Sequence, residues 1–169
     1  MKEEIIIKKV AVKNWEKFKE IRLEALKNNP EAFGSSYEEE VQRSDERWRI
    51  SLANKNKTVF LALDRKIPIA IATISYESMI KMNHLANIYS VYVKPEYRGR
   101  AISSKLIKSI LADVKKKKRI KKIKLNVVTT QLPAINLYKK FGFKIIAKLS
   151  KEVKLGKRYY DEYMMEKKL

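Results

Sequence analysis

The stretch from Ile88 to Leu106 constrains the fold most strongly, because it joins a strand, a tight turn and a helix. An apolar, β-prone run over 88–93 stops at Pro95, and a helical period begins at Ala101. The first turn of such a helix has N–H groups without intrahelical partners, at the positive end of the helix dipole. Small residues let a phosphate approach this main chain: Gly99, Ala101, Ser103 and Ser104. The stretch predicts an anion-binding turn, although similar turns without a ligand are common in α/β proteins.

Length and hydropathy indicate one domain. The 169 residues are 45% hydrophobic, which suits a single core, and no repeat or low-complexity linker divides them. The first residues lack the apolar core of a signal peptide, and no stretch approaches a membrane-spanning length. We therefore expect a single domain over 1–169 in a cytoplasmic protein.

Composition narrows the chemistry. The chain has no cysteine, which excludes disulfides, thiolate metal sites and a cysteine acyl intermediate, and with His84 as its one histidine it cannot build a histidine-rich metal site. We therefore expect no metal. Lys and Arg number 39 against 19 Asp and Glu, a net charge of +20 that favours anions from nucleic acid to phosphorylated cofactors. The densest basic run, 115–119, falls where a helix should end, so we interpret it as a solvated helix terminus.

Periodicity and turn signals order the elements along the chain. We expect strands over 5–12, 58–63, 67–76, 85–93, 120–128, 143–149 and 158–165, and helices over 15–28, 102–114 and 132–141. Asn14 is the expected N-cap of the first helix, and short acidic helices begin at Ser36 and Ser44. Their carboxylates either attract a cationic substrate or only stabilise helix N-termini. Three hairpin-connected strands followed by strand, helix and strand predict a meander with a parallel crossover.

The run from Tyr92 to Ala101 resembles the acyl-CoA pyrophosphate loop of the GNAT acetyltransferase superfamily. That loop has Arg or Gln, two residues, Gly, one residue, then Gly or Ala. Here the frame starts at Arg98, with Ala101 at the first glycine position and Ser103 at the second. Both side chains are small, so the loop can still close around a diphosphate.

A second segment, Thr130 to Phe143, is similar to another recurrent GNAT pattern, in which Asn is followed by Ala, then Leu-Tyr, then Gly-Phe. Gln131 stands where Asn is usual, and the rest of the pattern is kept. Alone, a tyrosine on a short helix is more often core packing. Two such segments in the family's order imply the GNAT fold: an α/β (α+β) domain with a mixed, mostly antiparallel six- or seven-stranded sheet flanked by about four helices.

The resemblance implies transfer of an acetyl group from acetyl-CoA to a primary amine by direct attack in a ternary complex. Tyr138 would be the acid that protonates the leaving thiolate, and main-chain groups of Val91 and Val93 would pair with the pantetheine. The implied cofactor-binding residues are Val91, Tyr92, Val93, Arg98, Gly99, Arg100, Ala101, Ile102, Ser103, Ser104, Asn126, Gln131 and Ala134.

The general base is not evident, because many relatives have a glutamate where this chain has Asn87. A water relayed by Tyr89, a carboxylate such as Glu77 or those over 38–40, and an amine that arrives deprotonated are all open. Asn87 and Tyr89 are the candidate acceptor-site residues.

Two other functions remain open. One is a GNAT-fold acyl-CoA-binding protein without transferase activity, which is consistent with the absence of a glutamate at Asn87. The other is a basic nucleic-acid-binding module, which we do not favour because the chain shows no zinc spacing, RNP-like motif or helix-turn-helix signal. We expect acetyl-CoA and an unidentified amine as partners, no membrane, and either a monomer or a homodimer.

Overall fold

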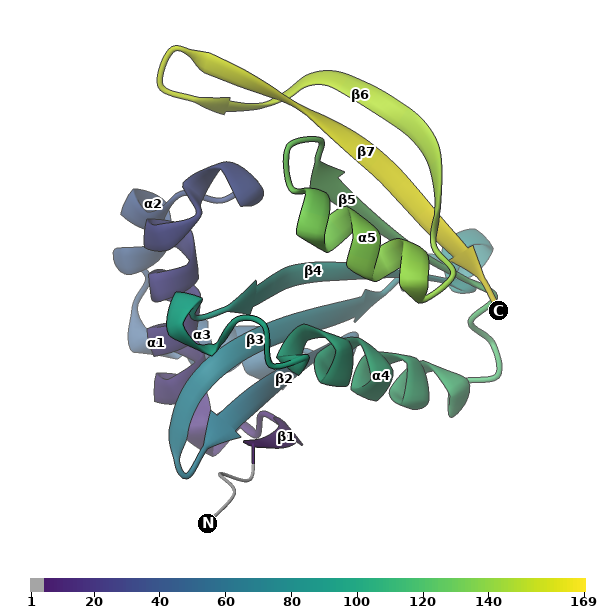
Figure 1. The fold of residues 1–169 in the computed structure, drawn as a ribbon. Helices are drawn as coiled ribbons and strands as arrows, with labels where there is room; N and C mark the ends of the chain where they lie inside the picture. The colour runs from purple at the N-terminus through teal and green to yellow at the C-terminus, as the bar shows by residue number, and fades with distance from the viewer. Residues whose placement is uncertain (1–4) are drawn as a thin grey trace.

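A seven-stranded sheet forms the centre of the computed structural model, which describes residues 5–169 (Figure 1). The strands are β1 (Ile5–Lys9), β2 (Lys57–Asp64), β3 (Ile67–Tyr76), β4 (Leu85–Val93), β5 (Lys122–Val128), β6 (Lys144–Leu155) and β7 (Arg158–Lys168). Their order is β1-β2-β3-β4-β5-β7-β6, and every neighbouring pair is antiparallel except β4 and β5. The predicted mixed, mostly antiparallel sheet is confirmed.

Five α-helices among residues 5–169 cover both faces of this sheet. They are α1 (Trp15–Asn28), α2 (Tyr37–Val41), α3 (Asp45–Ala53), α4 (Ile102–Lys115) and α5 (Leu132–Lys140). Alternate residues of β2 enter different cores: Phe60 packs with α4 and α5, whereas Leu61 packs with α1 and α3. The middle of the sheet is therefore buried on both sides.

Local signals explain several helix starts. The Ser36 hydroxyl accepts from the N–H of Glu39 at 3.2 Å, and the Glu39 carboxylate accepts from the N–H of Ser36 at 3.1 Å, which forms the predicted capping box of α2. Ser44 caps α3 in the same way. Asn14 is the N-cap residue of α1, as predicted, but its side chain makes no capping bond. The 3₁₀ turn η1 (Val12–Asn14) leads the chain into α1, and β1 ends at Lys9, earlier than predicted.

The sheet opens between β4 and β5. These strands pair only from Leu85 to Asn87, against Lys122 to Lys124. Beyond that point β4 carries a bulge at Ser90, which adopts a positive φ of 55° while the register with β3 shifts. The second half of β4 therefore diverges from β5, and its main chain faces the opening.

The β6–β7 hairpin is longer than the sequence pattern predicted, and its tip extends past the sheet toward α2 (Figure 1). No helix within residues 5–169 has both the length and the apolar character that a bilayer crossing requires.

Candidate active site

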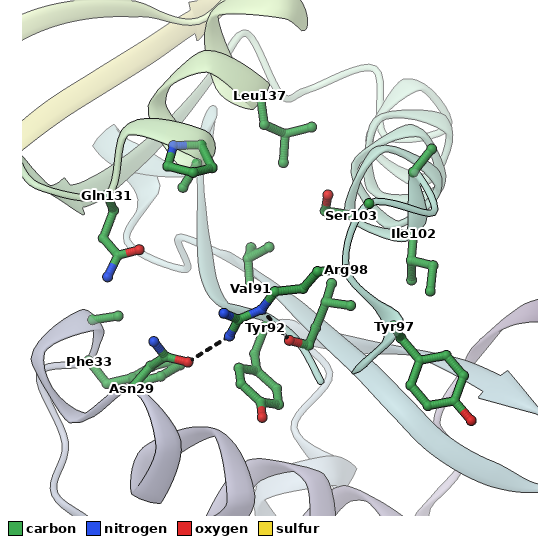
Figure 2. A pocket seen from close by; sticks show the side chains of 16 residues that line it. Asn29, Phe33, Val91, Tyr92, Tyr97, Arg98, Ile102, Ser103, Gln131 and Leu137 are labelled. Carbon is green, nitrogen blue, oxygen red and sulfur yellow. Dashed lines mark hydrogen bonds between the residues drawn. The ribbon is translucent and has the colours of Figure 1, made fainter. Parts of the chain in front are cut away.

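A cavity of about 280 Å³ lies where the end of β4 meets the start of α4 (Figure 2). We call it the α4 cavity. It is lined by Asn29, Ala32, Phe33, Val91, Tyr92, Val93, Tyr97, Arg98, Gly99, Ala101, Ile102, Ser103, Gln131, Pro133, Ala134 and Leu137. Most of the predicted cofactor residues are in this set. The sequence motifs missed the contribution of Asn29, Ala32 and Phe33, which follow α1 and belong to neither family-like segment.

The turn before α4 has the conformation that an anion site requires. Gly99 and Ala101 both adopt positive φ, at 77° and 56°, and α4 begins immediately afterwards at Ile102. The first N–H groups of α4 thus open onto the cavity without intrahelical acceptors. The two departures from the glycine pattern are not equivalent. Ala101 is held in the left-handed region, whereas Ser103 is helical and needs no glycine.

Arg98 crosses the α4 cavity and links its two walls (Figure 2). Its Nε donates to the carbonyl oxygen of Val93 at 3.2 Å, and its Nη2 donates to Oδ1 of Asn29 at 3.0 Å. On the other wall, Nε2 of Gln131 donates to Glu31 at 3.0 Å. The loop after α1 is therefore tied to both β4 and α5.

Two other predicted cofactor residues, Arg100 and Ser104, lie outside the lining of the α4 cavity. Arg100 places its guanidinium 5.2 Å from the ring centroid of Tyr97, and Ser104 lies in the first turn of α4. The Tyr92 hydroxyl accepts from Asn28 at 2.9 Å, so this side chain anchors α1.

Tyr138 lies on α5 with 5% of its surface exposed. Its ring packs edge-on against Phe143, with centroids 5.9 Å apart. Burial raises the pKa of the Tyr138 hydroxyl far above its ordinary value. The phenol therefore keeps its proton throughout the physiological range, and the same shift makes it a weaker acid. Tyr138 itself is not among the residues that line the α4 cavity. Ala134 and Leu137, on the same helix, line the α4 cavity.

A second cavity, of about 750 Å³, lies on the other side of the β4 bulge. We call it the hairpin cavity, because β6 and β7 supply one of its walls through Glu152, Val153, Glu162 and Met164. Both candidate acceptor residues, Asn87 and Tyr89, line it. The two cavities share Ala32 and Phe33, so they adjoin beneath the loop that follows α1.

Asn126, a predicted cofactor residue, lines the hairpin cavity and not the α4 cavity. Its Nδ2 donates to the Glu162 carboxylate at 3.0 Å. The reason is that β5 turns alternate side chains to opposite faces, and Asn126 shares the face of Lys124. Burial raises the pKa of Glu162, the Asn126 bond opposes this, and the charge of Glu152 adds to it. No motif singled out Glu162.

Three of the candidate base carboxylates, Glu39, Glu40 and Glu77, have hydrogen-bond partners. Glu77 accepts from Nδ2 of Asn87 at 2.8 Å. Glu40 is buried and accepts from Nε and Nη2 of Arg22 at 3.1 and 2.8 Å. Together with the capping role of Glu39, these bonds favour the structural reading of the acidic α2 segment.

Comparison with known proteins decides the family. The model of the acetyltransferase (GNAT) family matches residues 15–143, most of the chain. The chain belongs to the GNAT family. Both predicted GNAT segments lie inside the matched region, and the seven-stranded sheet with its divergent β4 and β5 is the framework that carries them.

Relatives of this GNAT protein act on different acceptors. It is 24% identical over 164 residues to the L-amino acid N-acetyltransferase AaaT of Escherichia coli, with 96% of each chain covered. It is 33% identical over 92 residues to an N-alpha-acetyltransferase of Sulfurisphaera tokodaii, covering 52% of this chain and 49% of the other. An acetyltransferase at the family level is therefore supported, and the acceptor differs among relatives.

Solved structures share the fold. A GNAT acetyltransferase of Streptococcus pneumoniae superposes with a TM-score of 0.89 at 18% identity, covering 98% of this chain and 100% of that one. The yncA protein of Salmonella typhimurium, solved with acetyl-CoA, gives a TM-score of 0.82 at 16% identity, covering 98% and 94%. At these identities the likeness concerns the fold, and one of these folds holds acetyl-CoA.

Proposed function

We propose that this GNAT protein is an N-acetyltransferase that moves an acetyl group from acetyl-CoA to a primary amine by direct attack in a ternary complex. The observation that carries the proposal is the pair of adjoining cavities. One begins at an anion-binding helix start, the other is lined by polar side chains, and the loop at Ala32 and Phe33 borders both.

The α4 cavity suits acetyl-CoA. N–H groups at the start of α4, together with Gly99 and the nearby Arg98 and Arg100, hold the pyrophosphate. The main chain of Val91 and Val93 receives the pantetheine, because β4 has no partner strand on the β5 side there. Acetyl-CoA, when bound, supplies the activated thioester.

Two protons move during the transfer, and Tyr138 accounts for one of them. The unprotonated amine of the acceptor attacks the thioester carbon, and the proton that leaves the nitrogen as the C–N bond forms passes to solvent water. Tyr138, kept protonated by burial, gives a proton to the departing sulfur as the C–S bond breaks. The sum of these steps is an amide and free CoA.

One structural feature is also consistent with a second candidate function. Asn87, at the position where many relatives have a glutamate, is committed to Glu77 and has no group that accepts a proton from an amine. A GNAT protein that binds acyl-CoA without transferring it is consistent with that residue. We also propose that residues 1–169 form one GNAT domain, as the full coverage of the pneumococcal structure supports.

One experiment separates the candidates. Calorimetry measures acetyl-CoA binding, and a thiol assay measures CoA release with a panel of primary amines. The proposal expects binding and acceptor-dependent release. Binding with no release from any amine would favour the acyl-CoA-binding protein, and no binding at millimolar acetyl-CoA would refute both.

A further inference from the structure

The charges of the hairpin cavity are separated along the sheet. Lys57, at the start of β2, and Arg43, after α2, line one end. Glu162 of β7 and Glu152 of β6 line the other end. In the sheet order, β3, β4 and β5 lie between β2 and β7, so these two groups of charges face each other across the candidate acceptor residues of β4.

The contacts of Lys57 leave its positive charge without an ion-pair partner among residues 5–169. Its ammonium donates to the Ser51 hydroxyl and lies 5.1 Å from the ring centroid of Phe18, and no carboxylate within residues 5–169 forms an ion pair with it. Burial, followed by the charges of Arg22 and Arg43, lowers the pKa of Lys57 to about 8, although Glu40 opposes the shift. An anion arriving beside Lys57 would be stabilised by a charge that the protein leaves uncompensated.

The nearest carboxylate is already shared. The Glu40 carboxylate accepts two hydrogen bonds from Arg22 and lies 3.7 Å from Nη2 of Arg43. Three cations, Arg22, Arg43 and Lys57, therefore surround one carboxylate at this end of the cavity. The excess of positive charge lines the space where an acceptor would lie.

The opposite end has the complementary character. Glu162 accepts a hydrogen bond from Asn126, and Glu152 lies near enough to raise its pKa further. Two neighbouring carboxylates, of which Glu162 is half-buried and Glu152 is exposed, favour an ammonium group. Lys124 also lines the cavity, in register with Asn87 on the neighbouring strand.

The strand register gives the distance from the Lys57 end of the cavity to the candidate acceptor residues of β4. Lys57 is opposite Ser75, and Ser75 is opposite Asn87, so Lys57 lies two strands, about 10 Å, from Asn87. A molecule held by Lys57 with its amine beside β4 fits a cavity of about 750 Å³.

We infer that the acceptor is a primary amine that also carries a carboxylate, bound with the carboxylate on Lys57 and Arg43 and with the amino group toward Glu162. This inference rests on the proposed transferase function, and it names the class of acceptor.

The test uses matched pairs of amines: glycine, β-alanine, 4-aminobutyrate and 6-aminohexanoate, each against its own amide. In the wild-type protein, kcat/KM for the carboxylate exceeds that for the amide about 10-fold at one or more chain lengths, which is the size of a charge-assisted hydrogen bond. In Lys57→Met the ratio falls to about 1, while kcat/KM for the amide changes less than about 3-fold. Lys55→Met, a nearby exposed lysine, is the matched control and keeps the wild-type ratio.

Two more variants locate the two ends. Glu162→Gln lowers kcat/KM for carboxylate and amide alike, because both share the amine. Lys124→Met leaves the ratio unchanged; if Lys124→Met abolishes it and Lys57→Met does not, the assignment to Lys57 is wrong.

Calorimetry of the same pairs with the CoA-bound protein keeps this inference separate from the proposed function. Tighter, Lys57-dependent binding of the carboxylate supports the acceptor class even if no acetyl group is transferred. Equal binding and equal kcat/KM for every carboxylate and amide would overturn the inference while leaving an active acetyltransferase intact.

Discussion

Ala101 carries backbone strain at the turn where the pyrophosphate is expected. A left-handed φ costs a non-glycine residue about 1–2 kcal/mol. A glycine there removes this strain, but it also loses more backbone entropy on folding, so the net gain in stability is smaller than the strain. We expect Ala101→Gly to raise the free energy of unfolding by about 0.5–1 kcal/mol, measured by urea denaturation. Ser103→Gly is the control, since Ser103 is helical and glycine there should cost about 0.5 kcal/mol. Equal effects of the two changes would contradict this account.

Because the pKa of Lys57 is lowered to about 8, we expect acceptor binding to depend on pH. Arg22 from α1, Glu40 and Arg43 from the α2 segment and Ser51 from α3 face the Lys57 ammonium. The pKa of Glu40 is lowered, so this carboxylate is ionised at neutral pH and above, whereas the pKa of Lys57 lies at about 8. A carboxylate acceptor should bind tightly below pH 8 and lose affinity as pH rises through that value.

The measurement is KM across about pH 7 to 10 for a carboxylate amine and its amide. We expect the KM of the carboxylate amine, divided by the KM of its amide, to rise above pH 8, because only the carboxylate compound depends on the Lys57 charge. Parallel profiles for the two compounds would exclude this role for Lys57.

At the scale of elements, the Arg22–Glu40 pair joins α1 to α2, and Nη1 of Arg22 also donates to the Ser90 hydroxyl at 3.0 Å. It therefore links both helices to the bulge of β4. Glu40→Gln leaves the Arg22 charge buried without its counterion and should lower the free energy of unfolding by about 3 kcal/mol at pH 7.

The pH dependence of that difference checks its cause. Burial raises the pKa of Glu40, but the hydrogen bond and charge of Arg22, with Arg43, outweigh burial and leave the pKa lowered. The stabilisation is therefore complete above the ordinary value of 4.5 and is lost as pH falls through the lower folded value. Urea unfolding of both proteins between about pH 3 and pH 7 should show the gap closing toward acid; a constant gap would show that packing, not charge, is responsible.

Single elements were predictable where local signals set their ends. The bounds of β4 and the start of α4 follow from the apolar run, Pro95 and the small-residue turn, and the structure agrees. Glu162 was not predictable in the same way. It meets Asn126 only because β7 inserts between β5 and β6, a pairing that no local pattern encodes.

The whole molecule shows the same division. The family and the mixed sheet followed from two motifs in the right order, and the first cavity formed mainly from residues that those motifs name. The loop after α1 and the hairpin cavity depend on contacts between segments far apart in the chain, such as Arg98 with Asn29 and Gln131 with Glu31. The spacing of residues along the sequence does not predict those contacts.

The net charge of +20 acts on the whole molecule, so it should affect how fast acetyl-CoA binds. Raising salt from about 0.05 M to about 0.5 M should slow association with the anionic cofactor about tenfold and change dissociation much less. Stopped-flow fluorescence can measure both rates. A salt effect confined to the dissociation rate would assign the electrostatics to local contacts instead.

The proposed acetyl transfer is tested by the kcat of Tyr138→Phe at saturating acetyl-CoA and amine. We expect kcat to fall about 100-fold while the Kd of acetyl-CoA stays within about twofold, because only the buried proton donor is removed. An unchanged kcat, or a loss explained entirely by weaker acetyl-CoA binding, would contradict the account.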